Sequence, residues 1–123
     1  MATRLGVVLT LLHEEIMETL ALLALLEARP GMEEQLQEFL SSALTMASLE
    51  RGTIAWYAIK LDASRFAIFD TFVDRNGREA HLSGEIARAL VEKADALLAT
   101  PPNIQLAEIV AAKSPASSSS SRG

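Results

Sequence analysis

Two residues in one apolar stretch of the chain, Thr53 to Leu82, have side chains that can move protons. Asp70 interrupts a run of apolar residues, and His81 follows a short way beyond it. A carboxylate whose pKa is raised by burial, or an imidazole titrating near neutrality, can deprotonate a phenol or hydroquinone. The resulting anion can then transfer an electron to oxygen. Asp70 and His81 are therefore the candidate catalytic residues.

Both residues also have ordinary structural interpretations. Asp70 could accept a hydrogen bond from Tyr57 or from a helix. His81 could be a half-buried residue that bonds the backbone or Asp70. The sequence leaves these alternatives open.

Aromatic and aliphatic residues on the same stretch are candidate walls of a pocket for a flat ligand. They are Tyr57, Trp56, Phe72 and Ile68, and the first two are the only Tyr and Trp of the chain. Trp56 also fits a core or interface position. Hairpin register decides which residue faces Asp70: a four-residue turn over Asp62 to Arg65 pairs Tyr57 with it, and a shift by one pairs Trp56.

Composition narrows the classes of function. The net charge of −5, without a Lys or Arg cluster, argues against a nucleic-acid partner. The chain has no cysteine, which excludes disulfides and thiolate metal sites and fits a cytoplasmic location. The apolar runs near the N-terminus are too short to span a membrane. We expect no metal and no cofactor.

Periodicity and turn signals predict two helices and four strands that position these residues. The segment from Thr19 to Ala28 is a continuous apolar run; Leu and Ala favour a helix, but its shortness and the following Pro-Gly turn favour a buried strand. The remaining predicted elements are a helix over 32–49, strands over 53–61 and 66–73, a turn over 74–77, a helix over 78–98 interrupted at Ser83-Gly84, and a strand over 103–112. Gly52 stands where a left-handed helix C-cap is expected.

This order is β-α-β-β-α-β, an α+β ferredoxin-like plait with an antiparallel sheet. Both faces of the central hairpin are apolar, and the helices can cover only one of them. We therefore predict a homodimer formed through the sheet. Residues 1–18 are read as an extension that is helical or disordered, 19–113 as the domain, and 114–123 as a flexible Ser-rich tail.

From Glu27 to about Lys113 the sequence resembles the antibiotic biosynthesis monooxygenase domain family. No single motif is specific, but their order and spacing match. The motifs are Ala28-Arg29-Pro30-Gly31 before an acidic helix start, Arg51-Gly52-Thr53-Ile54-Ala55-Trp56, Phe66-Ala67-Ile68-Phe69-Asp70-Thr71-Phe72-Val73-Asp74, and Glu79-Ala80-His81-Leu82-Ser83.

The resemblance implies a dimeric α/β barrel in which two plaits pack sheet to sheet. It also implies oxidation of quinol-like or polyketide aromatics by molecular oxygen without metal or flavin, in a pocket between sheet and helices. Asp70 stands at the family's acidic position and His81 at its helix histidine, whereas Trp56 replaces its usual Tyr and Phe72 its usual Trp or Tyr. Haem binding is not expected, because the haem-degrading members' functional positions fall at or near Glu27, Phe72 and Leu90.

A second hypothesis belongs to another class of function. The chain could be a non-catalytic dimeric plait that binds a small hydrophobic ligand or serves only in assembly. The Phe at position 72 and the scarcity of polar groups in the expected pocket favour this alternative.

Overall fold

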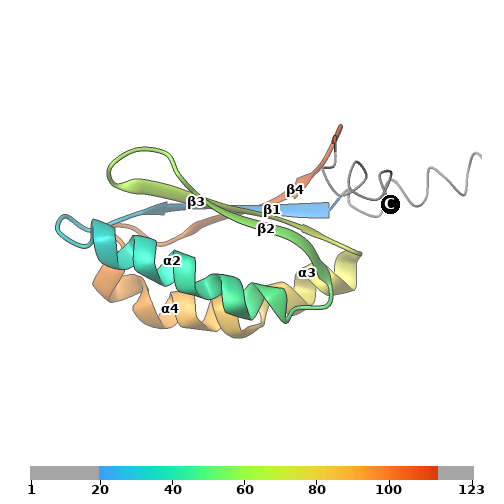
Figure 1. Cartoon of the computed structure of the whole chain (residues 1–123), viewed down its shortest axis with the longest axis horizontal. Coiled ribbons are helices and arrows are strands. Elements are labelled where there is room, and N and C mark those ends of the chain that lie inside the picture. The colour runs from blue at the N-terminus through green and yellow to red at the C-terminus, as the bar shows by residue number, and fades with distance from the viewer. Residues whose placement is uncertain (1–19, 114–123) are drawn as a thin grey trace, which may run out of the picture.

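A computed structural model describes residues 20–113 of the chain. Its elements are β1 (Leu20–Glu27), α2 (Glu33–Ser48), β2 (Thr53–Lys60), β3 (Arg65–Phe72), α3 (Arg75–Leu82), α4 (Glu85–Leu97) and β4 (Asn103–Glu108). The four strands form one antiparallel sheet in the order β2-β3-β1-β4. The helices lie on one face of this sheet, and the other face carries no helix of the described chain (Figure 1). The ferredoxin-like α+β fold is therefore confirmed.

The apolar run that the sequence predicted as a strand, against the helix propensity of its Leu and Ala residues, is strand β1. It lies in the middle of the sheet, between β3 and β4. Alternate residues of β1 and β3 point toward the helices and form the core with α2 and α4. The core members are Ala24, Leu26, Ala28, Leu36, Phe39, Leu40, Phe66, Ile68, Leu90, Leu97 and Leu98. Burial of these apolar side chains is the main stabilising contribution to the fold.

The second helical region begins earlier than the sequence predicted. The expected turn over 74–77 is the first turn of α3, because the Asp74 side chain caps the helix by accepting a hydrogen bond from the Gly77 amide at 2.8 Å. The predicted break at Ser83-Gly84 is confirmed, since α3 ends at Leu82 and α4 begins at Glu85. His81 consequently lies in the last turn of a short helix rather than near the start of a long one.

Gly52 does not have the left-handed conformation that the sequence predicted. Among the described residues only Gly31 has a positive φ, of 89°. Gly52 is instead required by a close approach: a Cβ there would lie 2.6 Å from the Cα of Gly77. This contact joins the α2–β2 connection to α3 and brings together two segments that are distant in sequence.

The hairpin register is the alternative in which Trp56 pairs with Asp70. Lys60 pairs with Phe66, so the connection from Leu61 to Arg65 is one residue longer than the four-residue turn considered from the sequence. The Asp62 side chain stabilises it by accepting hydrogen bonds from the amides of Ser64 and Arg65. Trp56 and Asp70 therefore share the helix-covered face, and Tyr57 lies on the opposite face.

Candidate functional site

Three ionisable side chains form a continuous line with His81 at its centre. His81 is on α3, Asp70 on β3, and Glu50 in the connection between α2 and β2. The His81 side chain points from α3 into the layer between helices and sheet, and the residue is 8% exposed. Its ring lies against Phe72, with centroids 5.3 Å apart and planes at 48°.

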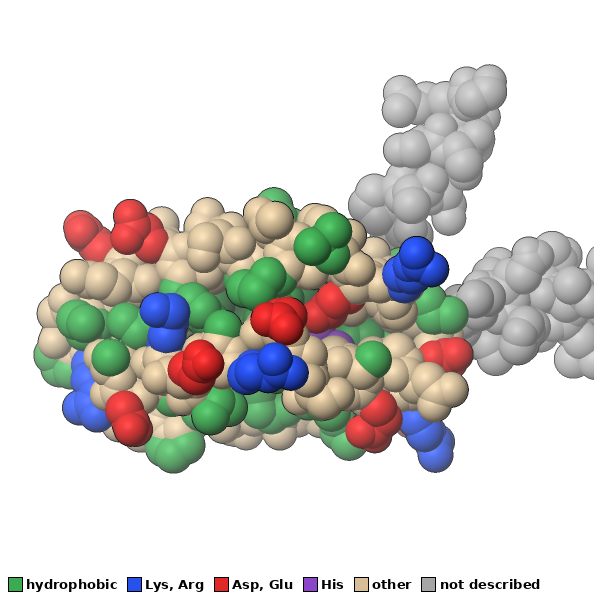
Figure 2. Space-filling model, turned by 90° about the horizontal axis from the view of Figure 1, so that it is seen from below, with side chains coloured by type: hydrophobic (Ala, Val, Ile, Leu, Met, Phe, Trp, Pro, Cys, Tyr) green, Lys and Arg blue, Asp and Glu red, His purple; other side chains and the backbone are tan. Residues whose placement is uncertain are grey.

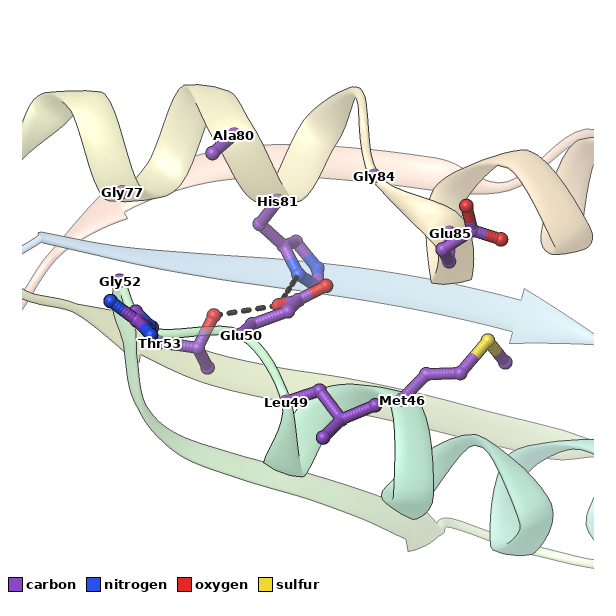
Figure 3. Close-up of a pocket in the computed structure, with 11 residues that line it drawn as sticks. Met46, Leu49, Glu50, Gly52, Thr53, Gly77, Ala80, His81, Gly84 and Glu85 are labelled. Atoms are coloured by element: carbon purple, nitrogen blue, oxygen red, sulfur yellow. Dashed lines mark hydrogen bonds and ion pairs between the residues drawn. The ribbon is translucent and has the colours of Figure 1, made fainter.

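The contact between His81 and Glu50 is short. Nδ1 of His81 lies 2.7 Å from Oε1 of Glu50. The same carboxylate oxygen accepts a hydrogen bond from the Thr53 hydroxyl at 2.7 Å (Figure 3). Strand β2 has a register irregularity between Thr53 and Ala55, a common device for redirecting a side chain at a strand end. Oε1 of Glu50 is thus held by both the Thr53 hydroxyl and the His81 ring.

The Asp70 contact is different in kind. Nε2 of His81 lies 2.9 Å from Oδ2 of Asp70, an ion-pair distance. Apart from this contact, neither Asp70 oxygen has a partner within residues 20–113. Asp70 is only 1% exposed. Because a buried carboxylate with so few partners is costly, such groups in native proteins commonly mark a functional position.

The two carboxylates determine the charge of His81. Burial disfavours the imidazolium, but the contacts with Asp70 and Glu50 outweigh burial and raise the pKa of His81 above its ordinary value of about 6.5. Near neutral pH the ring is therefore more readily protonated than a free histidine. With each nitrogen beside a carboxylate, His81 lacks the free ring nitrogen that a general base requires.

Two cavities lie on opposite sides of His81. The inner cavity, of about 40 Å³, lies between the sheet and the helices α3 and α4. Asp70 and His81 are its only ionisable lining residues, and the rest of its lining is aliphatic: Leu22, Ala24, Ile68, Leu82, Ile86, Ala87, Leu90 and Ile104.

The outer pocket is larger, at about 280 Å³. It lies between the C-terminal end of α2 and helix α3, and it contains the Glu50 carboxylate (Figure 3). Seen from the helix side, the surface shows a small patch of histidine in a hollow between charged side chains (Figure 2). Among the residues lining these two cavities, only His81 belongs to both.

The residues predicted from the sequence are only partly brought together. Asp70, His81 and Ile68 line the inner cavity. Phe72 is completely buried in contact with His81 and lines neither cavity described above.

The two residues of β2 line neither cavity. Trp56 packs half-buried against the core described above and against a second cluster of Ala43, Ala47 and Ile86, and its indole nitrogen is buried without a hydrogen-bond partner in the described chain. Tyr57 is 52% exposed on the opposite face of the sheet, so it cannot reach Asp70.

Glu50 is the functional candidate that sequence reasoning missed. It follows the predicted end of a helix, between Leu49 and Arg51, where a charged residue is normally solvated. Its partner His81 is far away along the chain, and no local spacing connects them. The only sequence signal was the pair Gly52 and Gly77, whose close contact closes the site.

The described chain contains neither a membrane-crossing helix nor a metal-binding cluster. No helix within residues 20–113 is long and apolar enough to cross a bilayer. No group of three or more His, Cys, Asp or Glu side chains in the same range could hold a metal ion.

The fold defines a class, the ferredoxin-like proteins with the fold of antibiotic biosynthesis monooxygenases. A crystal structure of an antibiotic biosynthesis monooxygenase is similar at a TM-score of 0.64 and 17% identity, covering 75% of this chain and 99% of that one. The crystal structure of PA3566 from Pseudomonas aeruginosa is similar at 0.67 and 23% identity, covering 76% and 96%. At these identities the likeness concerns the fold.

A nearer relative identifies the family. The crystal structure of NE2512 from Nitrosomonas europaea, a protein of unknown function, shares 52% identity at a TM-score of 0.79 and covers 81% of this chain and 97% of that one. The chain belongs to the family of NE2512. No protein-family model matches the sequence, and no curated protein does so either.

Proposed function

We propose that the chain is a monooxygenase that oxidises a small phenol or quinol-like aromatic with molecular oxygen, without metal or flavin. The observation that carries the proposal is Asp70, a carboxylate 1% exposed whose only partner within residues 20–113 is the His81 ring, facing an apolar cavity. The name of a structure with the same fold, antibiotic biosynthesis monooxygenase, supports the reaction class.

Asp70 serves as the general base in this proposal. It takes the proton of an aromatic hydroxyl, and the aryloxide gives an electron to oxygen. For a hydroquinone, the full reaction places one atom of O₂ on a ring carbon as a hydroxyl group and releases the other atom as water. Four electrons leave the quinol and reduce O₂, so the products are a hydroxyquinone and water.

His81 supplies charge rather than basicity. The contacts with Asp70 and Glu50 that raise its pKa favour the imidazolium, and a cation beside Asp70 stabilises a developing aryloxide at the same site. Both ring nitrogens lie next to carboxylates, at 2.7 Å and 2.9 Å. This arrangement favours Asp70 over His81 as the base.

The inner cavity limits how a substrate enters. Its volume of about 40 Å³ accommodates a hydroxyl group but not an aromatic ring. The ring would then lie toward Ile104, which lines the cavity and is 45% exposed at the strand β4. Leu82, half-buried on α3, also lines this cavity.

One observation favours the non-catalytic alternative. The aromatic residues expected to bind a flat ligand, Trp56, Tyr57 and Phe72, line neither the inner cavity nor the outer pocket. A binding or assembly role without oxidation would need no aromatic wall and no catalytic base.

Aerobic oxygen uptake with a panel of hydroquinones tests the proposal. Asp70→Asn keeps the shape and removes the base, so we expect uptake to fall about 100-fold or more. The matched control is Glu92→Gln, which makes the same carboxylate-to-amide change at an exposed position of α4. It should behave as wild type. Absence of uptake with every substrate, or full activity of Asp70→Asn, would exclude the enzymatic proposal. Ligand binding without uptake would support the non-catalytic alternative.

We further propose that two copies associate through the open sheet face. Tyr57, Ile59 and Leu61 lie on that face and are 52%, 44% and 47% exposed, a large apolar area for a free surface. Light scattering should give twice the mass of one chain, and Tyr57→Glu should give the mass of one. Val91→Glu, at an exposed apolar position on α4, is the control. A wild-type mass of one chain at micromolar concentration would contradict the proposal.

A further inference from the structure

The outer pocket is separate from the cavity in which oxidation is proposed. It is lined by a different set of residues, and the His81 ring lies between the two spaces. At about 280 Å³ it lies near the lower end of the size range of small-molecule sites, which suits a ligand with one ring. Met46 and Leu49 supply apolar surface, and Leu49 is 78% exposed.

Glu50 provides an oriented acceptor inside this pocket. Both of its close contacts, from Thr53 and His81, fall on Oε1. Oε2 accepts no hydrogen bond within residues 20–113, and it lies near Gly84, which lines the same pocket. The carboxylate cannot rotate freely without losing its two Oε1 partners, so Oε2 is already positioned for a donor.

Gly84 keeps this oxygen accessible. A Cβ at Gly84 would lie 3.4 Å from Oε2 of Glu50 and 3.1 Å from the Ala80 carbonyl oxygen. The absent side chain leaves Oε2 open to the pocket. Figure 3 shows Gly84 and Ala80 along the α3 side and Met46 and Leu49 along the α2 side, with the Glu50 carboxylate between them.

The charges around the pocket favour a cation. Two carboxylates, Glu50 and Glu85, line it with two groups that can be positive, His81 and Arg51, and the buried Asp70 behind His81 adds a third carboxylate. An anionic ligand would find no free donor on His81, whose nitrogens already contact carboxylates. A protonated amine can donate to Oε2 of Glu50 while its apolar part contacts Met46 and Leu49.

We propose that the outer pocket is a second binding site, which takes a small primary amine with an apolar or aromatic body and holds its ammonium group on Glu50. The site is independent of the oxidation proposed at Asp70. It shares only His81 with the inner cavity.

Titration with benzylamine at pH 7, followed by amide NMR shifts and calorimetry, tests the site. Gly52 and Gly84 should shift on saturation, and benzyl alcohol, of the same shape without charge, should bind at least about tenfold more weakly. Absence of binding up to millimolar benzylamine, or equal binding of the alcohol, would overturn the proposal.

Two variants locate the binding. Glu50→Gln should weaken benzylamine binding about tenfold or more, because the charge-assisted hydrogen bond is lost. Ala80→Leu should also weaken benzylamine binding, because the larger side chain occupies the pocket and leaves Thr53 and His81, the donors to Glu50, unchanged. This variant decides the question if Glu50→Gln does not fold. Glu79→Gln, an exposed neighbour on α3, is the control and should bind as wild type. Wild-type affinity in Ala80→Leu would overturn the assignment.

Discussion

The two sides of His81 carry the same chemical group in opposite surroundings. On the inner side, Asp70 is 1% exposed, has the His81 ring as its only partner in the described chain and faces an aliphatic cavity. On the outer side, the Glu50 side chain is 19% exposed, has two donors and faces an open pocket. Asp70 thus faces a closed apolar space that a substrate hydroxyl could enter, whereas Glu50 is held by Thr53 and His81 at the edge of an open pocket. The comparison explains why we assign proton abstraction to one side and ligand recognition to the other.

Removing His81 breaks both sides at once and should have the largest effect. His81→Ala leaves two carboxylates facing each other across a void, and breaking a buried ion pair by removing one partner costs about 3–5 kcal/mol. Urea denaturation at pH 6 measures the change. A cost below about 1 kcal/mol would show that His81 does not hold the two carboxylates together.

The control for this prediction removes the stranded charges as well. In the triple variant His81→Ala, Asp70→Asn, Glu50→Gln, no unpaired carboxylate remains. Part of the lost stability should return, because removing a whole ion pair costs less than removing one member. If the triple variant is less stable than His81→Ala alone, the charge interpretation is wrong.

Separate substitutions should distinguish the two sides. Asp70→Asn removes a fully buried charge partner of His81, and we expect a loss of about 1–3 kcal/mol at pH 6. Glu50→Gln acts on a partly exposed group and should cost about 1 kcal/mol or less. Urea denaturation of both variants under one set of conditions gives the ratio of the two losses in the free energy of unfolding. Equal losses would contradict the contrast in burial.

The pH dependence of stability should be the smallest of these effects. The pKa of His81 is higher in the folded than in the unfolded chain, so the folded state binds the proton more tightly. This contribution is complete below about pH 6.5 and is lost as pH rises through the folded pKa. Urea denaturation between pH 5 and 9 should show a decline that is absent in His81→Gln. An identical pH profile in wild type and His81→Gln would refute the assignment of this pH dependence to His81.

The sequence predicted the fold because its apolar runs, its Pro-Gly turn and its helix stripe all indicate the same arrangement. Even the ambiguous run over Leu20–Glu27 is a strand, as its short length predicted. The sequence did not predict the hairpin register, because one residue in the turn decides whether Trp56 or Tyr57 lies beside Asp70. The start of α3 was also missed, because an Asp before Asn-Gly is typical of a turn and also of a helix cap.

The sequence predicted only two of the three ionisable residues of the candidate site. Asp70 and His81 stood out because each is a polar residue in an apolar context. Glu50 did not, because a charged residue after a helix is common and its burial depends on the contact between Gly52 and Gly77. Such a contact between backbones leaves no periodic pattern in the sequence.

The most direct test of the account is the protonation state of the His81 ring, measured by ¹⁵N NMR of histidine-labelled protein at pH 7. Comparison with His81→Gln identifies the His81 signals, since His13 is the other histidine of the chain. The account predicts that a larger fraction of the ring carries protons on both Nδ1 and Nε2 than in a free histidine at the same pH, and that Asp70→Asn lowers this fraction. A protonated fraction in the wild-type protein at or below that of free histidine would contradict the raised pKa on which the account of the site depends.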